Sequence, residues 1–104
     1  GAKTETAAMA QWMIGESFFH QKNYEAALRA YMRVEILCDY PQWQAAALLQ
    51  AAKCRELLGE WNEAVRLYDQ LLKKYPNTPY TDQAKDRLQA ARQHLAGVNE
   101  MGNP

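Results

Sequence analysis

The chain is 104 residues long, and 48% of its residues are hydrophobic against 23% charged, so it can bury the core of one small domain. Ala, Leu and Gln together number 37, whereas Val, Ile and Thr number nine, which favours helix and argues against an all-β fold. Twelve basic residues balance twelve acidic ones, without the positive excess that nucleic acid or an anionic membrane surface would attract. No apolar run is long enough to predict a helix inserted in a membrane.

Turn signals divide the chain into five segments, each long enough for a helix and too long for a typical strand. The turns occur at Lys22-Asn23, Tyr40-Pro41, Gly59-Glu60 and over residues 75–79. Within the segments, apolar residues recur every three or four positions, which is the spacing of one helix face. We therefore expect helices over residues 6–21, 24–38, 42–58, 61–74 and 79–95.

Capping residues refine two of these ends. Asn23 is placed to cap the second helix, and Thr78 followed by Pro79 forms a cap and first turn for the fifth. Gly97 is expected to end the fifth helix, because glycine is the residue that helix C-termini favour. The sequence thus predicts a flexible tail over residues 97–104.

The chain superposes on itself when it is shifted by 37 residues. The sequence thus contains two copies of one helical hairpin, followed by the first half of a third copy. In each copy, small residues are placed where two helices can cross closely, and aromatic residues fill the space around the crossing. The shift brings Gly15 onto Ala52, Tyr24 onto Trp61, Ala27 onto Ala64, Tyr31 onto Tyr68 and Val34 onto Leu71.

In this order and at this constant spacing, these residues resemble the tetratricopeptide-repeat (TPR) family, whose pattern recurs about every 34 residues. Two departures are that Arg55 stands where an aromatic residue is usual and that the period is longer. Matching residues in the first copy are Trp12, Ile14-Gly15, Phe18, Tyr24, Ala27, Tyr31 and Pro41, and in the second copy Leu49, Ala52, Gly59, Trp61, Ala64, Tyr68 and Pro76.

The resemblance implies an all-α fold in which antiparallel helical hairpins stack as a right-handed superhelix of five helices. Residues 1–104 would then form a single TPR domain. Its first repeat would cover about residues 8–41, its second about 43–76, and a C-terminal capping helix about 79–96, ahead of the tail at 97–104.

The extra length of the repeat lies around two Tyr-Pro linkers, Tyr40-Pro41 and Tyr75-Pro76. These longer linkers resemble those in TPR modules of bacterial cell-envelope proteins, such as the periplasmic Tol-Pal-associated coordinator and outer-membrane-assembly lipoproteins. That resemblance implies a place in the periplasm or cell envelope. A cytoplasmic location is the alternative.

Catalytic and metal-binding patterns are missing from the sequence. Ser17 is the only serine, and it lacks the strand-turn-helix context of a nucleophile. His20 and His94 have no ligand spacing, the glycines are scattered singly, and Cys38 and Cys54 form no CxxC pair, so the cysteines are expected to pack as small hydrophobes. We therefore expect a protein that is not an enzyme and has no cofactor or metal.

TPR proteins line a concave groove with the first helix of each repeat, and the resemblance places an apolar strip rimmed by single charges there. Such a surface suits a peptide or a partner helix. The expected groove residues are Met9, Trp12, Met13, Glu16, Phe19, His20, Leu49, Gln50, Lys53, Glu56, Leu57 and Arg87.

The expected function is a scaffold for protein–protein interaction. Some family members bind chaperone C-terminal tails through a basic clamp, but here the matching positions hold Trp12, Glu16, Gln50, Gln83 and Arg87, so that ligand is not expected. Two alternatives stay open. One is a self-association module, which gives a homo-oligomer, and the other is a non-catalytic assembly arm of a larger cell-envelope protein. A rival to the binding groove is that Met9, Trp12 and Met13 are covered by another part of a longer protein or by a second copy.

Overall fold

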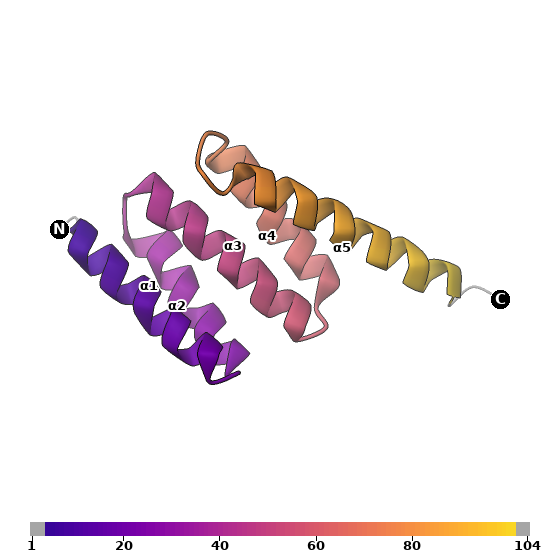
Figure 1. Cartoon of the computed structure of the whole chain (residues 1–104), viewed down its shortest axis with the longest axis horizontal. Helices are drawn as coiled ribbons and strands as arrows, with labels where there is room; N and C mark the ends of the chain where they lie inside the picture. Colours follow the sequence, from indigo (N-terminus) through magenta and orange to yellow (C-terminus); the bar gives the residue numbers. More distant parts are fainter. Residues whose placement is uncertain (1–3, 102–104) are drawn as a thin grey trace.

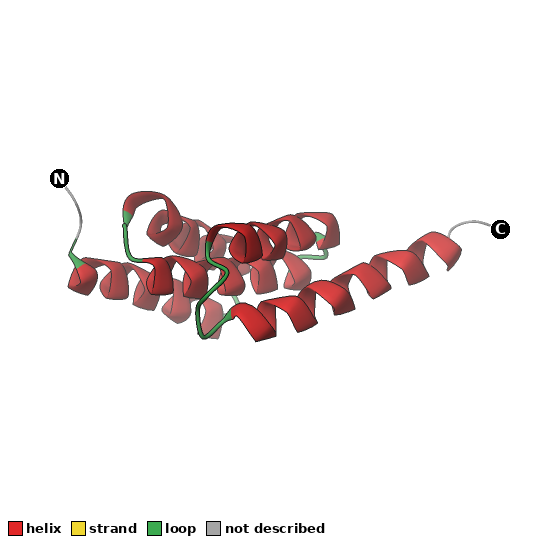
Figure 2. Ribbon diagram, turned by 90° about the horizontal axis from the view of Figure 1, so that it is seen from above, coloured by secondary structure: helices red, strands yellow, loops and turns green. Residues whose placement is uncertain are grey.

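A computed structural model describes residues 4–101, which form five helices and contain no strand. The helices are α1 (Glu5–His20), α2 (Tyr24–Leu37), α3 (Pro41–Leu57), α4 (Trp61–Lys74) and α5 (Thr81–Met101). In Figure 1, α1, α3 and α5 form the nearer layer and α2 and α4 the farther, fainter one. Figure 2 shows α5 projecting beyond the other helices towards the C-terminus. The all-α, five-helix prediction is confirmed.

The first two helices begin at caps that the sequence supplies. Thr4 Oγ1 accepts a hydrogen bond from the Ala7 amide at 3.1 Å, and Asn23 Oδ1 accepts one from the Ala26 amide at 3.4 Å, so the predicted cap at Asn23 is confirmed. Helix α3 begins directly at Pro41, whose fixed φ suits a first helical turn.

Both predicted ends of the last helix are wrong. Helix α5 begins at Thr81 rather than at Pro79. Thr78 Oγ1 accepts a hydrogen bond from the Tyr80 amide at 3.2 Å, as a cap would, but residues 79–80 form a turn ahead of the helix. The Thr81 hydroxyl holds this loop, because it accepts a hydrogen bond from the Thr78 amide at 3.2 Å and donates one to the Pro76 carbonyl at 2.9 Å. The helix then continues through Gly97 to Met101, since a glycine inside a helix costs only about 1 kcal/mol. The predicted tail is therefore helical over 97–101, and residues 102–104 lie outside the described residues.

Two core clusters fill the space between the layers, and they are related by the repeat. Helix α3 contributes to both, because it carries small and apolar residues on two opposite sides. Its Ala47, Ala51 and Cys54 pack in the first cluster, and its Ala45, Leu48, Leu49 and Ala52 in the second. Tyr31 and Tyr68, which the 37-residue shift superposes, are both fully buried, one in each cluster.

The hairpins are also tied together by polar contacts outside the core. Glu35 of α2 is buried, and its Oε1 accepts hydrogen bonds from Gln70 Nε2, Lys74 Nζ and Tyr75 Oη, each at 3.2 Å. At the other end of α4, the ring of Trp61 stacks on that of His94 with centroids 3.8 Å apart. These contacts fix α4 against α2 and α5.

The crossing of α1 and α2 leaves no room for a side chain at residue 15. A Cβ atom placed on Gly15 would lie 2.5 Å from two ring carbons of Tyr31, and that ring is fully buried and cannot move aside cheaply. Gly97 also lies inside a helix, but a Cβ atom there would meet nothing within 4 Å.

We expect Gly15→Ala to destabilise the protein by about 1–3 kcal/mol through overpacking against Tyr31. Gly97→Ala is the matched control, because it makes the same chemical change in an open helical site. It should stabilise the protein by about 0.5–1 kcal/mol, since alanine is the better helix former. Denaturant unfolding of both variants measures the difference. Equal midpoints for Gly15→Ala and wild type would show that the crossing is looser than the structure has it.

Candidate functional site

The candidate site is the surface shared by the three helices of the nearer layer in Figure 1, which we call the α1–α3–α5 face. Spacings of three and four residues place Met9, Met13, Glu16 and His20 along one side of α1. The same spacings place Gln50, Lys53, Glu56 and Leu57 on one side of α3, and Arg87 projects from α5. Helices α1 and α3 thus each contribute several of the predicted residues to this face, and α5 contributes Arg87.

The centre of the face is polar and links the three helices. Gln50 Nε2 donates a hydrogen bond to Glu16 Oε1 at 3.0 Å, which joins α3 to α1. Arg87 Nη2 lies 3.3 Å from Glu56 Oε1, and Arg87 Nε donates to the Tyr68 hydroxyl at 2.8 Å, which joins α5 to α3 and α4. The Tyr68 hydroxyl in turn donates to Glu56. The expected apolar strip is therefore interrupted by a network of charged side chains.

Lys53 lies between these two pairs and is half-buried. Burial, and then the positive charge of Arg87, lower the pKa of its ammonium group below the ordinary value, while Glu16 and Glu56 oppose that shift. The lysine therefore faces one cation and two carboxylates, and its side chain offers a cation and three donors to a ligand on this face.

The α1 end of the face is apolar. The side chains of Met9 and Met13 are 39% and 56% exposed. Trp12 between them is half-buried and packs on the first core cluster, with its ring centroid 5.8 Å from that of Trp43. Its indole Nε1 is buried without a hydrogen-bond partner among the described residues, so Trp12 presents ring carbon rather than a donor.

Two of the predicted residues, Leu49 and Phe19, differ from the expectation. Leu49 is only 3% exposed, because α3 is covered on both sides, and it belongs to the second core cluster, so it is not available to a partner. Phe19 is half-buried and packs edge-to-face on Tyr24 at 5.4 Å, which ties it to the end of the first hairpin. Leu57, by contrast, is 53% exposed at the end of α3. His20 is also exposed, and its Nε2 lies 3.8 Å from Glu16 Oε2.

Sequence reasoning missed the tyrosine hydroxyls. It assigned Tyr31 and Tyr68 to the core, where their rings do lie, but the hydroxyl of Tyr68 reaches the polar network through Glu56 and Arg87. Burial raises the pKa of both phenols well above the ordinary value, so both stay protonated and Tyr68 acts as a donor. The signal available in the sequence was that Tyr, rather than Phe, fills both positions.

Nucleophilic and metal-binding groups are not assembled in the part of the chain that the structure describes. Cys38 and Cys54 are free and buried, as expected for small core residues, and burial raises the pKa of the Cys54 thiol to about 12. Within residues 4–101, no three His, Cys, Asp or Glu side chains come together as metal ligands would. The described helices also lack the length or apolar character needed to cross a bilayer.

Comparison with protein families agrees with the repeat found in the sequence. The family described as tetratricopeptide repeat matches residues 9–35 and 46–78, which together make up more than half of the chain. Searches of curated proteins and of solved structures gave no significant match. The matched segments contain the α1–α2 crossing, α3 from residue 46 onward and the whole of α4. The chain therefore belongs to the tetratricopeptide-repeat family, whose helical modules are typically non-catalytic and generally mediate protein–protein interaction.

Proposed function

We propose that the α1–α3–α5 face binds a segment of a partner protein. The observation that carries this proposal is the exposed apolar patch at its α1 end, where Met9 and Met13 flank the half-buried ring of Trp12. Exposed methionines are flexible and polarizable, and they suit surfaces that accommodate a partner's apolar side chains. A large aromatic ring beside them supplies the kind of residue on which binding energy concentrates.

The polar centre of the face sets the second requirement on the ligand. Lys53 and Arg87 offer donors to backbone carbonyls or to acidic side chains, and Glu16 and Glu56 offer acceptors. We infer that the bound segment places apolar side chains over α1 and polar groups over α3 and α5. Because the network is already paired, such a ligand gains specificity there more than affinity.

The experiment is a selection of peptides from a random displayed library on the intact chain, followed by mapping of amide chemical shifts with a selected peptide. Binding to the α1–α3–α5 face is expected to shift the amides of Met9, Met13, Gln50 and Lys53. Shifts confined to the outer sides of α2 and α4 would contradict the proposal.

We propose further that this module works within a cell-envelope protein. The support is the pair of Tyr-Pro linkers, each followed by a helix that begins at or shortly after it. Fractionation of the cells that make the protein tests this location, and recovery in the cytoplasmic fraction would contradict it. The alternative of self-association is tested by solution mass at several concentrations, where a constant monomer mass contradicts it.

A further inference from the structure

Exposed apolar side chains gather at one edge of the stack. Two adjoining hollows of about 240 and 210 Å³ run along the outer side of the first hairpin, and they share Gln11, Ile14 and Arg33. Ile14 of α1 and Leu37 of α2 are 47% and 55% exposed there. We call this surface the α1–α2 edge, and its residues are Ala7, Ala10, Gln11, Ile14, Arg33 and Leu37.

The internal repeat shows what covers the equivalent face elsewhere in the molecule. Ala47 and Ala51 of α3 are fully buried in the cluster that α2 fills, and one repeat later Ala84 and Leu88 of α5 are buried in the cluster that α4 fills. One repeat earlier, the same positions are Ala10 and Ile14 of α1, and both are exposed. In α3 and α5 this face packs against the second helix of the preceding hairpin, which is α2 for α3 and α4 for α5. At the α1–α2 edge, α1 exposes the equivalent face.

The repeat also indicates the charge of a helix that would fit there. In the second unit, Gln70 and Lys74 of α4 donate to the buried carboxylate of Glu35 on α2, the second helix of the preceding hairpin. One repeat earlier, the position of Gln70 is held by Arg33. Within residues 4–101 the Arg33 guanidinium forms no ion pair, and no carboxylate lines either hollow. A carboxylate on a helix packed there, at the position equivalent to Glu35, would therefore lie beside the Arg33 guanidinium.

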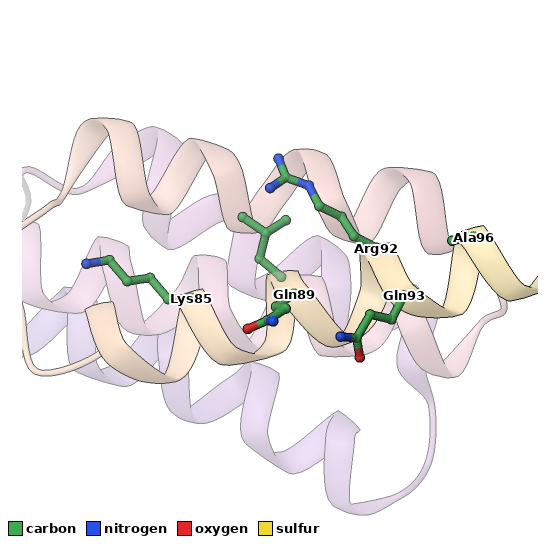
Figure 3. A pocket seen from close by; sticks show the side chains of 6 residues that line it. Lys85, Gln89, Arg92, Gln93 and Ala96 are labelled. Carbon is green, nitrogen blue, oxygen red and sulfur yellow. The ribbon is translucent and has the colours of Figure 1, made fainter.

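The opposite end of the stack is unlike this edge. The outer side of α5 borders an open hollow of about 590 Å³ lined mainly by long polar side chains (Figure 3). Gln89 and Gln93 stand there at the positions that Ala52 and Glu56 hold in α3, and Arg92 is already paired with Asp69 at 3.4 Å. This side therefore carries long polar side chains where the α1–α2 edge exposes Ile14 and Leu37.

We propose that the α1–α2 edge binds an amphipathic α-helix of a partner protein, packed on α1 as α2 packs on α3, with a carboxylate facing Arg33. This contact is separate from the α1–α3–α5 face and does not depend on it. A second copy of the chain is a poorer occupant, because two such edges placed together would bring Arg29 and Arg33 of both copies into one contact.

The probe is a synthetic peptide with the sequence of residues 24–38, which is the helix that covers the equivalent face of α3. Cys38 is replaced by Ser, and a lactam joins Glu25 to a lysine at position 29, both exposed in α2, because so short a helix is marginal in water. Titration of this peptide into the labelled intact chain is followed by amide chemical shifts. We expect saturable shifts at Ala7, Ala10 and Ile14.

A charge swap tests the proposed ion pair. Arg33→Glu in the protein, or Glu35→Lys in the peptide, should each weaken binding about fivefold or more, and the two changes together should restore it to within about twofold. Ile14→Gln in the protein should abolish measurable binding. Arg66→Glu on α4 is the matched control, because it reverses an exposed arginine away from the edge, and it should change binding by less than about twofold.

Three outcomes would overturn the proposal. Absence of shifts at the α1–α2 edge with millimolar peptide shows that the edge does not bind such a helix. Shifts at Met13, Gln50 and Lys53 alone place the peptide on the α1–α3–α5 face instead. Shifts of the Ala10 and Ile14 amides with protein concentration, without peptide, show that a second copy occupies the edge.

Discussion

Ala64→Leu and Ala27→Leu are each expected to unfold the protein or destabilise it severely. Both alanines are fully buried, one in each core cluster, at repeat-equivalent positions early in the second helix of their hairpins. Three extra carbon atoms at such a site force side chains off their rotamers and helices apart, which costs about 1–3 kcal/mol and sometimes more. In a domain of this size, each kcal/mol lowers the melting temperature by about 4–8 °C.

Thermal unfolding of the two variants measures this loss. Lys73→Ala is the control, because Lys73 is exposed in the last turn of α4, and it should change stability by less than about 0.5 kcal/mol. A melting temperature for Ala64→Leu equal to that of wild type would contradict the helix register that the repeat predicts.

Trp12→Ala is expected to weaken binding of a partner to the α1–α3–α5 face at least about 30-fold. A large ring at the centre of an interface commonly contributes more than about 2 kcal/mol, which corresponds to that factor. Because Trp12 also packs on the first core cluster, its loss lowers stability as well, so binding is measured at a temperature where the variant is folded. Calorimetric titration of the library-selected peptide gives the comparison.

Met13→Ala separates binding from stability, since the Met13 side chain is 56% exposed. It should weaken binding about fivefold while leaving the melting temperature nearly unchanged. Arg66→Ala, on the exposed side of α4, should change affinity by less than about twofold. If Arg66→Ala abolishes binding while Trp12→Ala and Met13→Ala do not, the partner lies on the outer surface and the assignment to the α1–α3–α5 face is wrong.

The helices and their pairing follow from local signals and from the repeat. Helix α4 begins and ends at the residues that the sequence predicts, because apolar spacing and turn residues act over only a few positions. The shift of 37 residues superposes residues of the first core cluster on residues of the second, so the pattern of buried small and aromatic side chains was also visible. The C-terminal end of α5 was not visible in the sequence, because a glycine such as Gly97 is compatible with a helix end but does not require one.

The placement of functional side chains was only partly visible in the sequence. Helical spacing placed Met9, Met13 and Glu16 along one side of α1, because that geometry depends on α1 alone. The exposure of Met13 and the bond between Glu16 and Gln50 depend on how α3 lies beside α1.

The sequence by itself determined five helices, their repeat and the small residues at their crossings, since each of these depends on neighbours in the chain or on the spacing of one helix. Only the tertiary structure decided that Leu49 is buried, that Tyr68 joins Glu56 and Arg87, and that Ile14 is exposed. Whether an apolar side chain is covered, or a polar one paired, depends on side chains distant in sequence that the packing of whole helices brings together. Ile14 and Ala51 hold equivalent positions in the repeat, yet one is exposed and the other buried, because α2 covers α3 whereas no described helix covers that side of α1.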